Sequence, residues 1–375
     1  MARATTQPKP HMQLSTITDA LESWAPRTLQ EPYDNCGLQV GDPSAQITSA
    51  LVCLDCTPSV VDEAVAQGCQ LIISHHPVIF KGLKSLAGNG YVERTIRAAL
   101  KHDVALYAIH TNLDNVISGV NGEIAERLGL RSLRVLDPKP DQLRKLAVFV
   151  PVAHADKLRN ALFAAGAGNV GKYDECSFNV EGTGTFRAGS GTAPFVGKEG
   201  EQHVEPETRV EVLCPAMHER AVLAAMRAAH PYEEVAYDLV PLLNTGPNIG
   251  SGIVGEWDQG LAETEFLALL KKTFKLTTIR HTKFLGKPIR RVALCGGSGA
   301  FLLGKAKGEG VDAYITGDVK YHEFFDADGD LLLADIGHYG SEQFTMHLIQ
   351  RRLGELFPTF AVRLTENVTD PIYHY

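Results

Sequence analysis

The chain has 375 residues, of which 44% are hydrophobic and 21% are charged, so it is long enough for two or three globular domains. A net charge of −8 without a block of Lys and Arg argues against a general nucleic-acid binder, and no apolar run reaches the length that spans a bilayer. Seven scattered cysteines, an odd number, indicate a reducing, cytoplasmic compartment. Residues 1–11 lack the apolar core of a secretory signal, and we expect them to form a disordered tail.

Strand and helix patterns alternate in the first part of the chain. Strands are predicted at 50–55, 69–74 and 104–109, with helices at 59–67, at 93–102 and within 118–129. This alternation implies parallel strands that are joined by crossover helices. In open α/β sheets, ligands bind at the carboxyl ends of the strands, so polar residues at those ends are the first candidates for a site.

Histidines and carboxylates follow three of the predicted strands. The candidates are His75 and His76 after 69–74, His110 and Asp114 after 104–109, and His338 and Glu342 after the apolar run 331–336. Imidazole and carboxylate ligands suit Zn, Fe or Mn, and a water that bridges two such ions is a hydrolytic nucleophile. The pattern therefore predicts a site for two metal ions. Asp114 and Glu342 also precede predicted helices, where each could serve only as a helix-capping or first-turn carboxylate.

The strand–helix pattern recurs late in the chain. Residues 51–77 align without gaps on 293–319 in the order strand, helix, Gly and strand, and a second register places His110 on His338 and Asp114 on Glu342. We therefore predict an α/β protein with two related halves, residues 12–142 and 244–375, that jointly form one metal site at the carboxyl ends of their strands.

The segment between the two halves, residues 143–243, has a different pattern. Strands are predicted at 145–152, 209–213 and 235–239, with helices at 155–165 and 219–230 and a Gly-rich stretch at 182–200. The order indicates an inserted α+β domain of ferredoxin-like type. Residues 244–255, rich in Gly, are expected to be the linker that returns to the second half.

Five motifs carry a resemblance to a known family. They are Tyr33-Asp34-Asn35-Cys36-Gly37-Leu38-Gln39-Val40-Gly41-Asp42, Ser74-His75-His76-Pro77, His110-Thr111-Asn112-Leu113-Asp114, Cys295-Gly296-Gly297-Ser298-Gly299 and Gly337-His338-Tyr339-Gly340-Ser341-Glu342. Over nearly its whole length the chain resembles the GTP cyclohydrolase 1 type 2 homologue family, also called Nif-three-like proteins. The insert, with Gly171-Lys172-Tyr173 and His230-Pro231-Tyr232-Glu233-Glu234, resembles the PII/CutA-like domain of the longer bacterial members.

The resemblance implies a dinuclear site for two divalent transition-metal ions in a protein that assembles as a toroidal homohexamer. Its implied metal ligands are His75, His76, Asp114, His338 and Glu342. Cys36 stands where the family is expected to have an aliphatic residue, and we expect this side chain to lie away from the site.

Two further histidines and one turn have open roles. His110 either transfers protons beside the metals or only packs at a strand end, and His322 is either an acid–base residue facing the same cleft or a surface residue. The Gly-rich turn Cys295–Gly299 either binds a phosphate through its backbone amides or is a tight turn without a ligand.

Two functions fit these features. The first is a metal-dependent hydrolase that acts on a small nucleotide-like or phosphate-bearing substrate through a metal-bridging hydroxide. The second is a non-catalytic metal-binding or regulatory protein that uses the PII/CutA-like insert for sensing or assembly. Five protein ligands for two ions would leave coordination positions vacant, which favours the enzyme.

Overall fold

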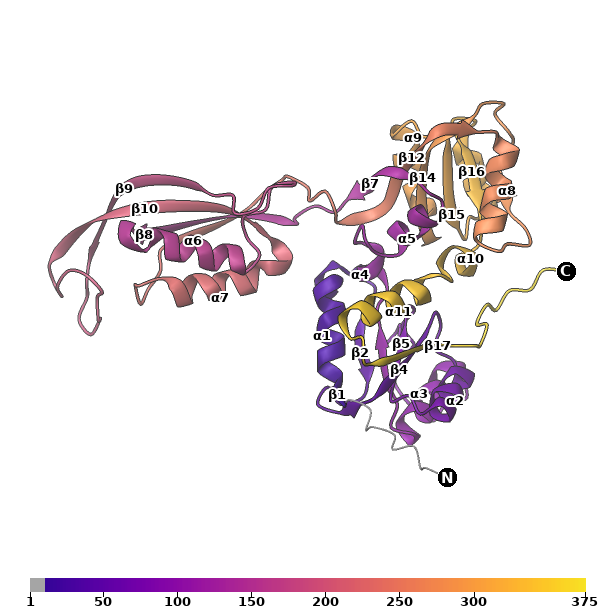
Figure 1. The fold of residues 1–375 in the computed structure, drawn as a ribbon, viewed down its shortest axis with the longest axis horizontal. Helices are drawn as coiled ribbons and strands as arrows, with labels where there is room; N and C mark the ends of the chain where they lie inside the picture. Colours follow the sequence, from indigo (N-terminus) through magenta and orange to yellow (C-terminus); the bar gives the residue numbers. More distant parts are fainter. Residues whose placement is uncertain (1–10) are drawn as a thin grey trace, which may run out of the picture. The chain divides into compact units, whose positions relative to one another are not determined.

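The computed structural model describes residues 11–375 and divides the chain into two compact units. The first unit combines the residues up to Asp137 with Gly250–Tyr375, and the second unit is Pro138–Ile249 (Figure 1). Most of the tail expected at 1–11 lies outside the described residues. Within residues 11–375, no helix combines the length and apolar character needed to cross a membrane.

The first unit contains a five-stranded sheet in the order β17-β4-β5-β6-β2. Its strands are β2 (Gly37–Val40), β4 (Ser49–Cys53), β5 (Leu71–Ser74), β6 (Ala105–Ala108) and β17 (Ala361–Leu364), and its helices are α1 (Leu14–Trp24), α2 (Pro58–Gln67), α3 (Tyr91–Lys101) and α11 (Thr345–Leu356). Strands β17, β4, β5 and β6 are parallel, whereas β2 is antiparallel to β6. Every residue of β4, β5 and β6 is buried, because helices cover both faces of the sheet (Figure 1). Strands β1 (Met12–Gln13) and β3 (Gln46–Ile47) form a separate two-stranded sheet.

A six-stranded sheet completes the first unit, in the order β13-β16-β15-β14-β12-β7. Its strands are β7 (Arg131–Pro138), β12 (Gly250–Leu261), β13 (Arg280–His281), β14 (Ile289–Ser298), β15 (Ala313–Gly317) and β16 (Leu332–Asp335). The helices of this region are α5 (Val120–Arg127), α8 (Glu263–Thr273) and α9 (Leu303–Gly308). Strands β14, β15 and β16 are parallel, while β12 and β13 pair antiparallel at either side of them.

Local sequence signals set where the helix between β4 and β5 begins and ends. Helix α2 has Pro58 in its first turn, and Gly68 ends it in the left-handed conformation with φ 68°. Two very short helices, α4 (Thr111–Asp114) and α10 (His338–Glu342), begin just after the carboxyl ends of β6 and β16. These helices carry the carboxylates of the predicted site.

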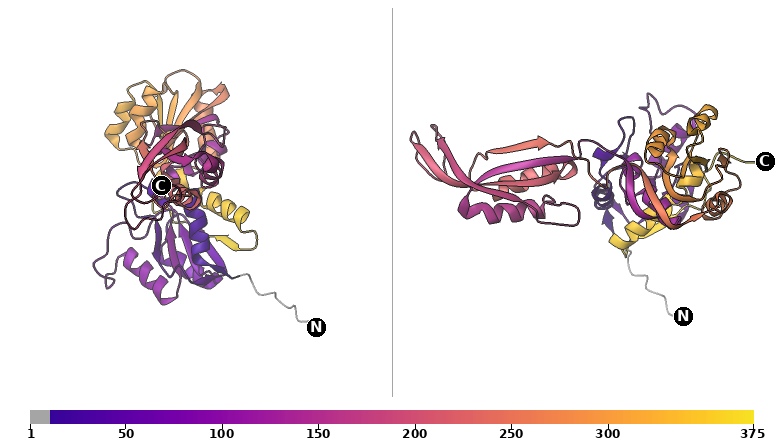
Figure 2. Two further views of the ribbon diagram at one scale, coloured as in Figure 1. Left: turned by 90° about the vertical axis from the view of Figure 1, so that its left-hand side faces the viewer. Right: turned by 90° about the horizontal axis from the view of Figure 1, so that it is seen from above.

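The second unit is a four-stranded antiparallel sheet in the order β11-β8-β10-β9. Its elements are β8 (Leu143–Pro151), α6 (Ala155–Ala164), β9 (Phe178–Arg187), β10 (Gln202–Pro215), α7 (Glu219–Ala229) and β11 (Tyr237–Pro241). Helices α6 and α7 lie side by side on one face of the sheet (Figures 1 and 2). The core between helices and sheet includes Leu146, Val148, Leu158, Val210 and Met226.

The structure differs from the sequence-based expectations in two places. The Gly-rich stretch at 182–200, in which no strand was predicted, contains most of an edge strand, β9, whose side chains are largely exposed. The linker expected at 244–255 already contains the start of β12. A Cβ atom at Gly252 would lie 2.9 Å from the Leu294 carbonyl oxygen, so glycine here permits close packing within the sheet rather than a loose linker.

Candidate metal centre

Six side chains converge at the carboxyl ends of β5, β6 and β16. Their ligand atoms form three overlapping groups, His75/His76/His110, His76/His338/Glu342 and His75/Asp114/Glu342, and within each group all the atoms lie within 4.8 Å of one another. The structure thus brings together the five residues predicted as ligands and adds His110 to them. Groups of this kind can hold a metal ion, and their role as ligands stays a prediction.

Glu342 occupies the middle of this cluster, and its two oxygens face different groups. Oε2 lies 2.9 Å from His76 Nε2 and 3.1 Å from His338 Nε2. Oε1 lies 3.8 Å from His75 Nε2, which is 3.7 Å from Asp114 Oδ1. The Glu342 side chain is only 3% exposed. One buried carboxylate therefore connects two sets of donors.

Two atoms of the cluster fit a bound cation because nothing else satisfies them. His75 Nε2 and Asp114 Oδ1 are buried, and neither has a hydrogen-bond partner within the described part of the chain. Buried polar atoms without partners are costly and therefore rare in folded proteins. A divalent ion between these two atoms would remove that cost, and imidazole with carboxylate is a donor set that suits Zn, Fe or Mn.

The second ring nitrogen of each histidine is held by an acceptor. His75 Nδ1 lies 2.8 Å from the Ile109 carbonyl oxygen, and His76 Nδ1 lies 2.7 Å from Asp55 Oδ1. His338 Nδ1 likewise lies 2.7 Å from Asp318 Oδ2. Such partners fix the tautomer and orientation of metal-binding histidines, so that Nε2 faces the centre.

Sequence reasoning did not identify these acceptors. Asp55 lies just beyond β4, and Asp318 directly follows β15. Their position after parallel strands is the signal that would have found them, since the carboxyl ends of those strands meet at the same edge of a sheet.

His110 is held by a buried carboxylate from the first motif. Its Nδ1 lies 2.9 Å from Oδ1 of Asp34, whose side chain is fully buried. Asp34 Oδ2 also accepts hydrogen bonds from the Thr111 backbone amide and hydroxyl and, at 3.0 Å, from the Cys36 thiol. Cys36 thus contacts Asp34, the partner of His110, and belongs to none of the three ligand groups found among residues 11–375. Burial alone would raise the pKa of Asp34, but these bonds, the one from His110 foremost, hold it well below its usual range.

The pKa shifts of the other clustered residues indicate that the buried carboxylates favour positive charge beside them. Burial would lower the pKa of His76 and of His338, but hydrogen bonds to the Glu342 carboxylate, and to Asp55 and Asp318 respectively, raise these values to about 10 and about 11. Burial and the charge of Glu342 raise the pKa of Asp114. Without a metal ion, the two imidazoles therefore carry protons that balance the carboxylates.

The Gly-rich turn at the end of β14 supports Glu342 rather than offering free amides. The amides of Gly296, Gly297 and Gly299 donate to the side chains of Asn121, Ser341 and Thr316. A Cβ atom at Gly297, where φ is 62°, would lie 2.3 Å from Glu342 Oε1. These three amides are engaged, which favours the tight-turn interpretation over phosphate binding.

His322 lies in the 3₁₀ segment η5 (Tyr321–Ala327) and is exposed. Its ring packs against Tyr321, with centroids 5.2 Å apart, and against Phe325, with centroids 6.3 Å apart. Across residues 11–375 it belongs to none of the three ligand groups. The structure does not bring His322 into the cluster, and its acid–base role stays a prediction.

Two surfaces adjoin the cluster. On one side, a cavity of about 570 Å³ is lined by His338 and Asp318 together with Lys275, Arg280 and Tyr339. On the other side, the rings of Tyr33, Phe80 and His110 form a chain with centroid separations of 6.2 and 6.3 Å. Tyr33 and Phe80 are 64% and 42% exposed, so aromatic faces are accessible beside the candidate ligands.

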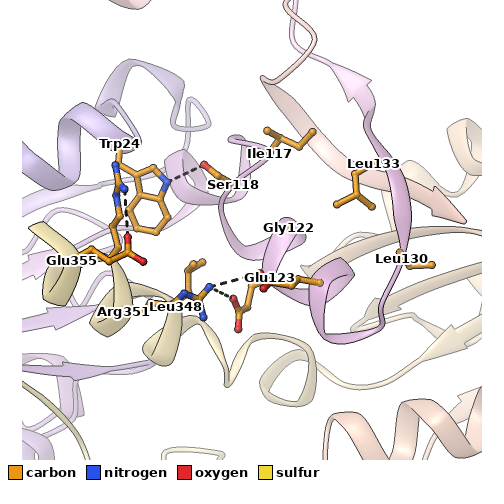
Figure 3. Close-up of a pocket in the computed structure, with 12 residues that line it drawn as sticks. Trp24, Ile117, Ser118, Gly122, Glu123, Leu130, Leu133, Leu348, Arg351 and Glu355 are labelled. Carbon is orange, nitrogen blue, oxygen red and sulfur yellow. Dashed lines mark hydrogen bonds and ion pairs between the residues drawn. The ribbon is translucent and has the colours of Figure 1, made fainter. Parts of the chain in front are cut away.

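A further cavity of about 510 Å³ lies between α1, α5, α11 and β7 (Figure 3). Trp24 Nε1 donates to Ser118 Oγ at 3.0 Å, and Arg351 donates to Glu123 at 2.7 Å. Its principal polar groups are thus engaged with one another. We interpret it as a structural groove that holds α11 in place.

Comparisons with known proteins show the family of this chain. The family model described as Duf34/NIF3 (NGG1p interacting factor 3) matches residues 12–371. The GTP cyclohydrolase 1 type 2 homolog of Halalkalibacterium halodurans is 42% identical over 326 residues, which are 86% of this chain and 87% of that protein. The Bacillus subtilis protein of the same name is 38% identical over 358 residues, which are 94% and 96% of the two chains.

The fold agrees as well. The crystal structure of a Bacillus cereus protein related to NIF3 matches with a TM-score of 0.86 and 36% identity, over 98% of this chain and 100% of that one. The family resemblance read from the five motifs is therefore confirmed. The chain belongs to the Duf34/NIF3 family.

Proposed function

We propose that this chain holds two divalent transition-metal ions and hydrolyses a small, nucleotide-like or phosphate-bearing substrate. The observation that supports two ions rather than one is the placement of Glu342, with one oxygen toward His76 and His338 and the other toward His75 and Asp114. When bound, ions of this kind activate water and stabilise the negative charge that develops on an attacked group.

His110 is the residue that we assign to proton transfer. One of its ring nitrogens lies within 4.8 Å of those of His75 and His76, while Asp34 holds Nδ1. The buried, ionised Asp34 fixes the orientation of the ring. An imidazole held in this way can take a proton from a nucleophile and return it to a leaving group.

The surroundings favour a substrate that contains a flat ring. Tyr33 and Phe80 offer aromatic faces on which a heterocycle can stack. In the cavity next to His338, Arg280 is paired with Asp335, and Lys275 is the cation that can contact an anionic group. The name carried by the relatives, GTP cyclohydrolase 1 type 2 homolog, points to the same class of substrate.

Metal analysis of protein purified without chelator tests this proposal. We expect close to two equivalents per chain, and we expect Glu342→Gln to lower the occupancy of both positions because it removes the shared charge. His322→Ala, an exposed histidine outside the ligand groups, is the matched control and should leave the metal content unchanged. A ratio near zero after reloading with Zn or Mn would overturn the proposal.

A screen of the metal-loaded protein tests the hydrolase part. Nucleotides, phosphodiesters and cyclic amides form the panel, and His76→Ala is the inactive control. Turnover that is lost in His76→Ala and lowered by roughly 10²–10⁴-fold in His110→Ala supports the assignment. Turnover that survives in His76→Ala would assign the activity to a contaminant.

The second unit favours the alternative of a regulatory or assembly role. It forms its own compact unit, with strands and helices in the order β-α-β-β-α-β, which supports a ferredoxin-like, PII/CutA-like assignment. If metal-loaded protein turns over nothing in the screen, this role becomes the better account of the metal site.

We also propose that the two halves of the first unit are related. The ladder pairs Ala50 with Leu71 in one sheet and Val292 with Ala313 in the other, which is the register of the gapless alignment of 51–77 on 293–319. The second alignment, which places His110 on His338, differs from the strand pairing in the structure by one residue. Leu71 pairs with Ala105 but Ala313 pairs with Leu332, so the counterpart of His110 is Gly337 rather than His338.

A further inference from the structure

We propose that the second unit carries a binding site for a small organic cation of the ammonium type. The site is a cavity of about 510 Å³ lined by residues of β9 and β10, by the loop between them and by the segment that follows α7. None of its residues takes part in the metal chemistry proposed above, so the two proposals stand independently.

Three aromatic rings form the walls, and we call Phe186, Phe195 and Tyr232 the aromatic cage. The Tyr232 ring centroid lies 6.0 Å from that of Phe186 and 6.3 Å from that of Phe195, with interplanar angles of 59° and 48°. Rings tilted in this way do not stack on one another, and all three line the same cavity. The negative faces of aromatic rings attract cations, and cages of this kind recognise alkylated ammonium groups.

The charge around the cavity has the matching sign. Its charged lining residues are Glu207, Glu233 and Glu234 against Arg187, an excess of carboxylates. His230, which packs against Tyr232, does not offset this excess, because burial lowers its pKa and keeps the ring neutral near pH 7. A cationic ligand therefore gains from both the rings and the carboxylates.

Gly184 gives the Glu207 carboxylate its place in the cavity wall. A Cβ atom at Gly184 would lie 2.2 Å from Glu207 Oε2 and 2.6 Å from its carboxyl carbon, so any larger residue would displace the carboxylate. Gly182, two residues earlier on the same strand, has no atom within 4 Å of its ideal Cβ position. The strand thus offers a perturbing substitution and a matched control.

Ligand-detected NMR titration of the full chain with choline tests the proposal, with 3,3-dimethylbutan-1-ol as the uncharged isostere. We expect saturable binding of choline with a dissociation constant on the order of 1 mM and binding of the alcohol about tenfold weaker. Phe195→Leu keeps an apolar side chain but removes the ring, and Glu207→Gln removes the charge. Each should weaken choline binding several-fold.

Substitution of Gly184 and of Gly182 separates displacement of the Glu207 carboxylate from a general effect of alanine on the strand. Gly184→Ala should weaken choline binding, and Gly182→Ala should leave it unchanged. Equal binding of choline and the alcohol would show an apolar hollow and overturn the proposal. So would an equal loss in both glycine variants, or the absence of saturable binding of choline and of tetramethylammonium at concentrations up to about 50 mM.

Discussion

In the candidate metal centre, one ring nitrogen of each histidine is bonded to an acceptor, and the other nitrogen faces the cluster. His75 uses a backbone carbonyl, while His76 and His338 use the carboxylates of Asp55 and Asp318. This division has an electrostatic consequence. A carboxylate at Nδ1 and the shared Glu342 at Nε2 favour the protonated ring, so that a metal ion must displace protons from His76 and His338.

The stability of the metal-free protein should therefore fall at alkaline pH. The pKa of His76 rises from 6.5 to about 10 on folding, so its contribution is fully present below pH 6.5 and is lost as the pH rises through about 10. His338, with a pKa of about 11, extends the loss further. Thermal melts of chelator-treated wild type and of His76→Gln, compared between pH 6 and pH 11, measure the effect.

We expect the difference in melting temperature between wild type and His76→Gln to become smaller toward high pH. After reloading with Zn, this difference should depend much less on pH. A difference in melting temperature that grows with pH in the chelator-treated protein would contradict the charge assignment.

At the scale of elements, hydrogen bonds connect the chain after β17 to the candidate metal centre. Thr365 and Asn367 bond to Glu63 of α2, and Thr369 Oγ1 donates at 2.9 Å to Asp55 Oδ2. Asp55 uses its other oxygen for His76 Nδ1. The C-terminal segment thus orients a carboxylate that in turn orients a candidate ligand.

Substitutions along this connection should lower metal affinity in a graded way. Asp55→Asn should weaken binding by about 10- to 100-fold, as expected when the outer partner of a ligating histidine is lost. Thr369→Val should weaken it less, since it removes one hydrogen bond to Asp55 and keeps the shape of the side chain. Competition with a chromogenic chelator measures both affinities.

Thr365→Val is the control, because it removes a similar bond to Glu63, which is not a partner of any candidate ligand. Equal effects of Thr365→Val and Thr369→Val would mean that the segment acts only through general stability.

At the scale of the whole molecule, the second unit is inserted where its two ends meet. The backbone amide of Lys139 bonds to the Ile249 carbonyl oxygen at 3.0 Å, and β7 and β12, which flank the insert, are neighbours in the six-stranded sheet. Inserts whose ends lie close together can be removed without opening the host core. All six side chains of the candidate metal centre lie outside Pro138–Ile249.

Deletion of residues 140–248, with Lys139 and Ile249 joined by a short Gly-Ser linker, should leave a folded first unit with the metal content of the full chain. It should also abolish choline binding, because the aromatic cage is removed. Metal analysis, circular dichroism and the NMR titration check these outcomes. An insoluble product, or one that binds no metal after reloading, would place part of the insert in the core.

The sequence predicted the parallel strands and the candidate ligands because each of these features is local. Histidines and carboxylates stand within a few residues of an apolar run, and Gly68 marks the end of α2. The positions of Asp55 and Asp318 after parallel strands mark them as candidates too, but the sequence does not say which histidine each of them, or Asp34, would hold. The partners of Asp34, Asp55 and Asp318 lie 76, 21 and 20 residues away, and only the pairing of strands brings them together.

Strand register and edge strands also limited what could be predicted from the sequence. The one-residue offset between β6 and β16 depends on backbone hydrogen bonding, which alignment of the sequence does not contain. Strand β9 was missed although Phe178, Val180 and Phe186 alternate with polar residues, because the strand also contains two glycines, a residue type that strands disfavour.

The separation of the ligands along the chain has a consequence for biosynthesis. His76 and Glu342 meet although 266 positions separate them, and β17, which pairs with β4, is made later still. A ribosome must therefore have produced almost the entire polypeptide before the shared carboxylate can join the histidines. A chain that terminates before Glu342 would present His75 and His76 without the shared carboxylate, so metal held by the whole cluster would mark a chain that extends past this residue.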